Sequence, residues 1–143
     1  MQKGADRVEA EKKPRILVVD DDPGLQTLVK ALLVRAEMKP IAALNAEEAV
    51  QALRHRPLPD VLILDLMLPD ISGITLLRQL RSKEVFNGLP VIILSAMADP
   101  DTIREGLSSG ADRYLTKPYL ANNLIKTLHE IMHVERKAAP PEE

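Results

Sequence analysis

The chain of 143 residues contains no cysteine and no tryptophan, and aromatic residues make up only 2% of it. The absence of cysteine excludes disulfide bridges, thiolate metal sites and cysteine nucleophiles, and it fits a reducing compartment. The chain also lacks a large charge of one sign, since 19 basic and 21 acidic residues give a formal net charge of -2. Without a basic field, we expect no direct binding of nucleic acid.

Long apolar runs are missing as well, so no segment predicts a membrane span, and the charged first 13 residues lack the apolar stretch of a secretory signal. We therefore expect a cytoplasmic protein with no membrane partner. An apolar content of 45% is enough for one buried core. The composition predicts a charged N-terminal tail over 1–13, one domain over 14–134, and a C-terminal tail or linker stump over 135–143.

Between the tails, short apolar runs alternate with amphipathic stretches, which is the pattern of β/α units with a parallel sheet. Strands are predicted over 16–20, 41–44, 61–65, 91–96 and 113–117. Helices are predicted over about 23–37, 45–55, the stretch after Gly73, 101–108 and about 120–132. Asn45 and Glu48 resemble a capping box at the start of the second helix, and Gly110 is suited to end the fourth.

The composition of the strands predicts their order. The strands over 16–20, 61–65 and 91–95 are apolar throughout and should lie inside the sheet, whereas 41–44 and 113–117 are weaker and should lie at its edges. With right-handed crossovers, this gives a five-stranded parallel sheet of order 2-1-3-4-5, doubly wound with five helices, which is a flavodoxin-like α/β fold. Such folds bind ligands at the carboxyl ends of strands one and three.

Acidic residues follow two of the strands that should be neighbours. Asp20, Asp21 and Asp22 leave the first strand, and Asp65 leaves the third. Two carboxylates about 4 Å apart repel by roughly 4 kcal/mol at an effective dielectric near 20, so the cluster should raise a pKa or bind a cation. Oxygen ligands alone favour magnesium, with manganese as the alternative.

Polar residues also end the other two strands on this side of the sheet. Ser95 offers a hydroxyl and Lys117 a mobile positive charge, and both suit a phosphoryl group that a metal-neutralised carboxylate could accept. Each residue alone has an ordinary structural explanation, since Asp commonly caps helices and begins turns. Their joint position at four strand ends favours a phosphoryl-transfer site.

The strings ILVVDDDPGL, ILDLMLPDISG, VIILSA and GADRYLTKP, in this order, resemble the receiver domains of two-component response regulators, over about residues 14–134. The resemblance implies that Asp65 is the phosphoacceptor. It implies that magnesium is bound by Asp20, Asp21, Asp65 and the backbone carbonyl of Met67. The phosphoryl group would then contact two further side chains, Ser95 and Lys117.

The same resemblance implies a switch and its partners. Tyr114 matches an aromatic residue that swings inward on activation, and the peptide between Lys117 and Pro118 is typically cis in the family. The phosphodonor would be a sensor histidine kinase or a histidine phosphotransfer protein. A downstream protein would bind the surface formed by the fourth helix, the fifth strand and the fifth helix.

The resemblance also implies that the chain is not an enzyme in the ordinary sense, because it would catalyse only its own phosphorylation and slow self-dephosphorylation. Met67 and Met97 lie two residues beyond the acceptor and the hydroxyl, positions that in the family influence the lifetime of the phosphate. Apolar side chains at these positions cannot align an attacking water. We therefore expect slow self-dephosphorylation.

Two other functions fit parts of the sequence. The string VVDDDPGL also resembles the haloacid dehalogenase signature, which would make the chain a phosphohydrolase with Asp20 as its nucleophile and would leave Asp65 without a role. A receiver-like interaction module that is never phosphorylated is the second alternative, although every charged residue of the site is present.

Overall fold

The structure is a computed structural model, and it describes residues 13–117 and 121–133. Within these residues, five strands form one parallel sheet in the order β2-β1-β3-β4-β5. The strands are β1 (Arg15–Val19), β2 (Lys39–Ala43), β3 (Val61–Leu64), β4 (Val91–Ser95) and β5 (Arg113–Thr116). The order predicted from the apolar content of the strands is confirmed, since β3 and β4 are buried throughout, β1 almost so, and the edge strands only in part.

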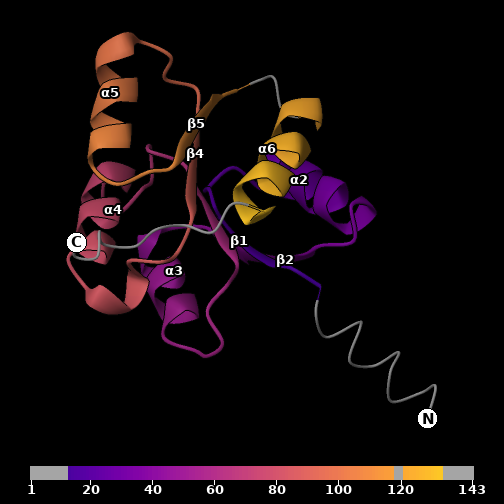
Figure 1. The fold of residues 1–143 in the computed structure, drawn as a ribbon. Coiled ribbons are helices and arrows are strands. Elements are labelled where there is room, and N and C mark those ends of the chain that lie inside the picture. The colour runs from indigo at the N-terminus through magenta and orange to yellow at the C-terminus, as the bar shows by residue number, and fades with distance from the viewer. Residues whose placement is uncertain (1–12, 118–120, 134–143) are drawn as a thin grey trace.

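Five α-helices cover the two faces of the sheet within the described residues. Helices α2 (Pro23–Arg35) and α6 (Ala121–His133) lie on one face (Figure 1). Helices α3 (Ala46–Leu53), α4 (Gly73–Arg81) and α5 (Pro100–Ser108) lie on the other. The chain thus has the doubly wound architecture that the alternation of its apolar runs predicts.

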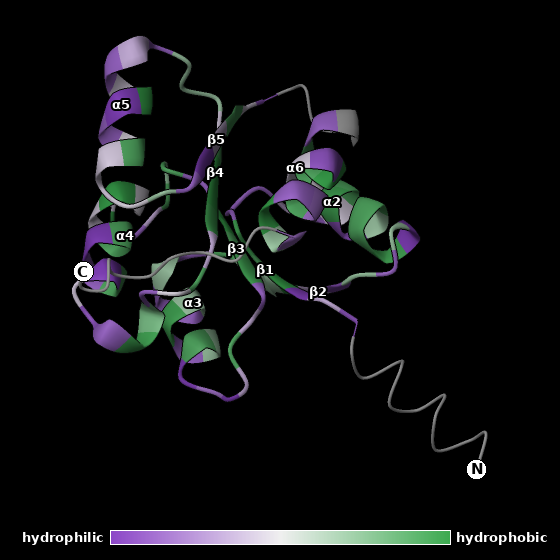
Figure 2. Cartoon of the chain, in the orientation of Figure 1, coloured by the Kyte–Doolittle hydropathy of each residue, from purple (hydrophilic) through white to green (hydrophobic). Residues whose placement is uncertain are grey.

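Alternate side chains of the interior strands enter two cores. Leu17 and Val19 of β1 pack with α3 and α4, whereas Ile16 and Val18 pack with α2 and α6. Successive residues of a strand point to opposite faces, so a strand that is apolar throughout supplies both cores. Figure 2 shows the resulting apolar sheet between amphipathic helices.

The helices begin at residues that suit a helix start. Pro23 occupies the first turn of α2, and the side chain of Asp22 accepts hydrogen bonds from the amides of Gly24 and Leu25. Asn45 caps α3 by accepting from the amide of Glu48 at 2.8 Å. Glu48 in turn accepts from the amide of Leu44, one residue before the position expected in a capping box.

The structure also has features that the sequence patterns do not predict. A 3-10 helix, η1 (Glu84–Phe86), lies between α4 and β4, and it is too short to produce a periodic pattern. The ends of the predicted elements differ from the observed ones by a few residues. None of the helices within the described residues combines the length and the apolar character needed to cross a bilayer.

Candidate functional site

The site lies at the carboxyl ends of the two central strands. Val19 of β1 is paired with Leu64 of β3, so the next residues, Asp20 and Asp65, leave neighbouring strands at the same level. The amide of Asp20 donates to the carbonyl of Ala43, and that of Asp65 donates to Val19, each at 3.0 Å. The backbone of both residues is therefore fixed by the sheet.

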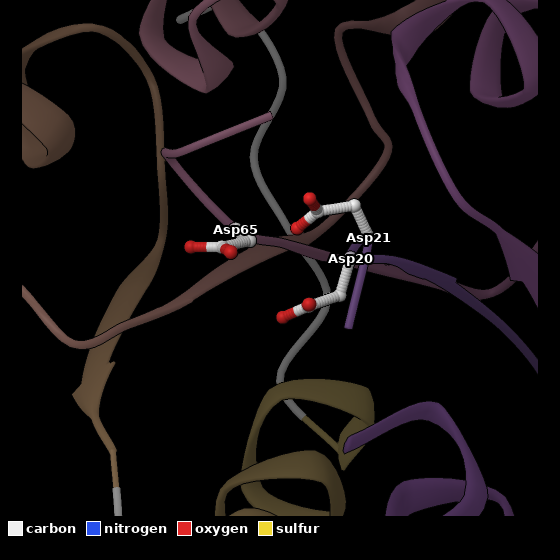
Figure 3. Close-up of side chains that lie close together, drawn as sticks. All are labelled: Asp20, Asp21 and Asp65. Carbon is white, nitrogen blue, oxygen red and sulfur yellow. The ribbon is translucent and has the colours of Figure 1, made fainter. Parts of the chain in front are cut away.

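Three carboxylates gather at this edge of the sheet. Asp20, Asp21 and Asp65 each offer an oxygen atom within 4.8 Å of the others, and Figure 3 shows the three side chains side by side. Asp20 and Asp65 are only 2% and 6% exposed, whereas Asp21 is exposed. The cluster predicted from the strand ends is thus present, with two of its members buried.

Lys117, directly after β5, reaches both buried carboxylates. Its Nζ atom lies 2.9 Å from Asp20 Oδ2 and 3.4 Å from Asp65 Oδ2. The residue is separated by 97 positions from Asp20, and the parallel sheet brings them together because their strands end on the same side.

The charges and burial of the site perturb the protonation of its groups. Burial raises the pKa of Asp65, and the negative charge of Asp20 raises it further, while Lys117 opposes both effects. Burial by itself would lower the pKa of Lys117, but its contacts with Asp20 and Asp65 outweigh that effect and raise it. The lysine is therefore held in its charged form beside Asp65, a carboxyl group that resists ionisation.

The residues present fit a divalent cation. Three carboxylates and one ammonium group carry two net negative charges when all are ionised, and a single divalent ion would balance them. Oxygen is the ligand type that magnesium prefers, and magnesium needs only one or two carboxylates because it keeps several waters. Asp20, Asp21 and Asp65 are the side chains that could hold it.

Ser95 and Tyr114 are connected through one backbone segment. Ser95, at the end of β4, is fully buried, and its Oγ atom accepts from the amide of Met97 at 3.2 Å. The hydroxyl of Tyr114 donates to the carbonyl of the same Met97 at 2.6 Å. Burial raises the pKa of Tyr114, as do the charges of Asp99 and Asp65, so the phenol stays a hydrogen-bond donor at neutral pH.

Two residues flank the site with apolar side chains. Met67 is 63% exposed and Met97 is 37% exposed. The amide of Met67 makes a long hydrogen bond, 3.4 Å, to Oδ1 of Asp65.

Pro118 lies outside the described residues, so the cis peptide expected after Lys117 stays a prediction. The described residues do contain a cis peptide, between Arg56 and Pro57.

Two polar residues near the site give no signal in the sequence. The side-chain nitrogen of Gln26, on α2, lies within 3.1 Å of three backbone carbonyls, those of Val18, Asp20 and Ala43. Asp70, in the loop between β3 and α4, accepts from two amides at the start of α3. The contact of Gln26 with Ala43 and those of Asp70 with α3 join segments at least 17 residues apart, so no local pattern predicts them.

Comparison with known proteins agrees with this geometry. The sequence model of the response regulator receiver domain matches residues 16–129. The chain belongs to this family. Its receiver domain is 38% identical, over 128 residues, to the transcriptional regulatory protein TrcR of Mycobacterium tuberculosis, covering 87% of this chain and 49% of that protein. It is 34% identical to the phosphate regulon regulator PhoB of Escherichia coli, covering 82% of this chain and 51% of PhoB.

Solved receiver domains have the same fold. The receiver domain of the Francisella response regulator 1452 is 35% identical, with a TM-score of 0.78, over 85% of this chain and 98% of that one. The BeF3-activated receiver domain of Klebsiella pneumoniae RstA is 28% identical, with a TM-score of 0.77, over 84% and 99%. The chain spans about half the length of the curated relatives it matches.

Proposed function

We propose that this receiver domain is a phosphoacceptor switch in which Asp65 takes a phosphoryl group from a phosphohistidine of a partner protein. The observation that carries the proposal is the position of Asp65, which lies beside two other carboxylates and within 3.4 Å of Lys117. A carboxylate that lies beside a lysine ammonium group, and beside further carboxylates that could hold a divalent cation, suits transfer of a group that is itself anionic. The haloacid dehalogenase alternative gains no support from the family match, which covers residues 16–129.

In the proposed reaction, a carboxylate oxygen of Asp65 forms a bond to phosphorus while the bond from phosphorus to the histidine nitrogen breaks. The imidazole of the donor leaves, and an aspartyl phosphate results. Lys117 neutralises charge on the phosphoryl oxygens, and the hydroxyl of Ser95 donates to one of them. Magnesium, when bound by Asp20, Asp21, Asp65 and the carbonyl of Met67, supplies the remaining positive charge.

The proposed output begins at Ser95. Its hydroxyl is bound to the amide of Met97, whose carbonyl accepts from Tyr114, so a movement of Ser95 toward the phosphoryl group would reach Tyr114 through this segment. Phosphorylation would then shift an existing equilibrium of the surface formed by α5, β5 and α6. In this scheme the surface binds a downstream protein.

The proposed partners are a sensor histidine kinase or a histidine phosphotransfer protein upstream, acting in the cytoplasm, and a protein target downstream. The relatives TrcR and PhoB are transcriptional regulators about twice as long as their match to this chain. We infer no nucleic-acid binding by the receiver domain itself, since its net charge is -2. Exposed apolar residues at positions 67 and 97 support slow self-dephosphorylation.

Mass spectrometry after incubation with acetyl phosphate and magnesium tests the proposal. We expect one added phosphoryl group in the natural chain and in Asp60→Asn, a control at the opposite end of the sheet, and none in Asp65→Asn. Turnover of a phosphomonoester that is abolished by Asp20→Asn but not by Asp65→Asn would favour the dehalogenase. Magnesium binding without phosphorylation by small donors or a kinase would favour the interaction module.

A further inference from the structure

The carboxylate of Asp70 binds the first turn of a helix that is distant in the sequence. Its Oδ1 atom accepts from the amide of Ala46 and its Oδ2 atom from the amide of Glu47, both at 3.0 Å. Oδ1 also accepts from the amide of Ile71 at 3.0 Å. Together with Asn45, which accepts from Glu48, Asp70 supplies acceptors for the first three amides of α3.

These bonds are charge-assisted. The amino end of a helix carries a partial positive charge, and a carboxylate placed there makes stronger hydrogen bonds than a neutral acceptor. Consistent with this geometry, the hydrogen bonds from Ala46 and the neighbouring amides lower the pKa of Asp70. Asp70 is therefore ionised at neutral pH and joins the loop after β3 to α3.

The same loop carries two of the proposed magnesium ligands, Asp65 and the carbonyl of Met67. It runs from Asp65, the proposed acceptor, through Met67 to Gly73 at the start of α4. At its base the amide of Gly73 donates to the carbonyl of Leu66 at 2.8 Å. A Cβ atom on Gly73 would lie 2.3 Å from the carbonyl oxygen of Asp65, so α4 packs directly against the acceptor backbone.

Between these attachments the loop projects outward. Leu66 and Gly73 are buried, whereas Met67, Pro69 and Asp70 are exposed. Among residues 13–117 and 121–133, the amide of Met67 has one hydrogen-bond partner, Asp65, at the long distance of 3.4 Å. The bonds of Asp70 to α3 thus form a polar attachment at the outer part of the loop, three residues beyond Met67.

We propose that Asp70 is a positioning residue for the divalent-cation site, holding the loop so that the carbonyl of Met67 faces the carboxylates of Asp20 and Asp65. This inference rests on the proposed function, because it assumes a magnesium ion at that site. Asp70 itself does not touch the ion. It acts through the backbone of the loop, as residues that orient metal ligands do.

Magnesium titration of four purified 143-residue proteins tests the inference. They are the natural chain, Asp70→Ala, Asp70→Asn, and Asp60→Ala as control. Asp60 is also a carboxylate that accepts a distant backbone amide, that of Arg15 at 2.8 Å, but it lies at the opposite end of the sheet. Affinity for magnesium is measured by calorimetry without a phosphodonor, and amide hydrogen exchange is measured on the same samples.

We expect Asp70→Ala to weaken magnesium binding about tenfold, the lower limit for residues that orient metal ligands. Exchange at the amides of Ala46, Glu47 and Met67 should become faster. The magnesium affinity of Asp70→Asn should lie between those of the natural chain and Asp70→Ala. The side-chain amide of asparagine keeps one acceptor oxygen but turns an N–H donor toward the helix. Asp60→Ala should leave the magnesium affinity unchanged.

Three results would overturn this inference and leave the proposed function intact. Two are unchanged magnesium affinity in Asp70→Ala and unchanged exchange at Ala46 and Glu47 in that variant. The third is equal weakening in Asp60→Ala, because the effect would then be one of general stability. Failure of the natural chain to bind magnesium would overturn the metal site, and the inference with it. The titration of the natural chain therefore separates the two failures.

Discussion

At the scale of single residues, Lys117 is the group that compensates the buried charge of the site. Its ammonium group contacts two carboxylates that are nearly inaccessible to water. In Lys117→Met, and without magnesium, Asp20 and Asp65 lose the positive charge that lies beside them. We expect the free energy of unfolding in metal-free buffer at pH 7 to fall by about 2 kcal/mol, less than for a fully buried pair because the lysine is 22% exposed.

Urea unfolding with and without magnesium measures this effect. Magnesium should recover most of the loss in Lys117→Met, because the ion supplies the missing positive charge. Lys126→Met, at an exposed position of α6, is the control and should change the unfolding free energy little. A loss that is the same with and without magnesium would show that Lys117 contributes through packing instead.

Gln26 is a second residue whose role is visible only in three dimensions. One nitrogen atom contacts the carbonyls of Val18, Asp20 and Ala43. Gln26→Met removes the donor, and we expect a loss of about 1–2 kcal/mol in the unfolding free energy. Gln26→Glu should lose more at pH 7, because a carboxylate would face three carbonyl oxygens, and part of that loss should disappear at acidic pH.

The comparison that decides this prediction is with Gln51→Glu, an exposed position of α3. Urea unfolding at pH 7 should rank the variants Gln51→Glu, Gln26→Met and Gln26→Glu from smallest to largest loss. If Gln26→Glu were as stable as the natural chain, the three carbonyl contacts would contribute nothing measurable.

The site residues differ in how far the sequence could predict them. Four of them stand where a predicted strand ends: Asp20, Asp65, Ser95 and Lys117. Parallel strands bring their carboxyl ends together, so the pattern of short apolar runs in the sequence was enough to predict that these residues lie close to one another. Gln26 and Asp70 contact backbone that is 17 and 24 residues away. Such contacts depend on the path of loops, which no periodic pattern describes.

At the scale of elements, the start of α4 packs against the backbone of Asp65, the proposed phosphoacceptor. A side chain on Gly73 would meet the carbonyl oxygen of Asp65 at 2.3 Å and the Cα atom of Leu66 at 2.7 Å. Both are backbone atoms, so the contact can be relieved only by moving α4 or the backbone of Asp65 and Leu66. We expect Gly73→Ala to lower the unfolding free energy by about 2–4 kcal/mol and to slow phosphorylation of Asp65.

Gly88→Ala is a matched control for this prediction, since a Cβ atom there would meet nothing within 4 Å. It should be neutral or slightly stabilising, because alanine restricts the unfolded chain. Urea unfolding and the rate of phosphorylation by acetyl phosphate are measured on both variants. Equal unfolding free energies and equal phosphorylation rates in the two variants would contradict the close packing of α4 on the backbone of Asp65.

The elements themselves were predictable because their apolar periodicity is strong. Strands β1, β3 and β4 are apolar except for Arg15 and Ser95 at their ends, and they fill both cores. Their apolar character also predicted that they lie in the interior of the sheet. The 3-10 helix η1 has only three residues, fewer than one period of a helical pattern. Strand β2 begins at Lys39 and Pro40, residues that disfavour strands by composition, so its start was predicted two residues late.

At the scale of the whole molecule, we expect ionised Asp65 to lower stability in the absence of metal. The pKa of Asp65 lies above its ordinary value of 3.8 because of burial and the charge of Asp20. A raised pKa means that folding favours the protonated form. The stabilising contribution is therefore complete below the ordinary pKa and is lost as the pH rises through the raised one.

It follows that Asp65→Asn should be more stable than the natural chain in metal-free buffer at pH 7, and that the difference should shrink near pH 3, where Asp65 is protonated in both states. Urea midpoints at the two pH values measure this. Asp101→Asn is the control, since its side chain is 89% exposed and should show neither effect. A less stable Asp65→Asn at pH 7 would mean that Lys117 outweighs burial.

Magnesium should reverse this order. At a hundredfold excess over its Kd, a ligand that binds only the folded state adds about 2.7 kcal/mol to the natural chain. Asp65→Asn lacks one of the three carboxylates and should gain much less. The natural chain would then be less stable than Asp65→Asn without the ion and more stable with it. The concentrated negative charge that destabilises the metal-free cluster is also what attracts the cation.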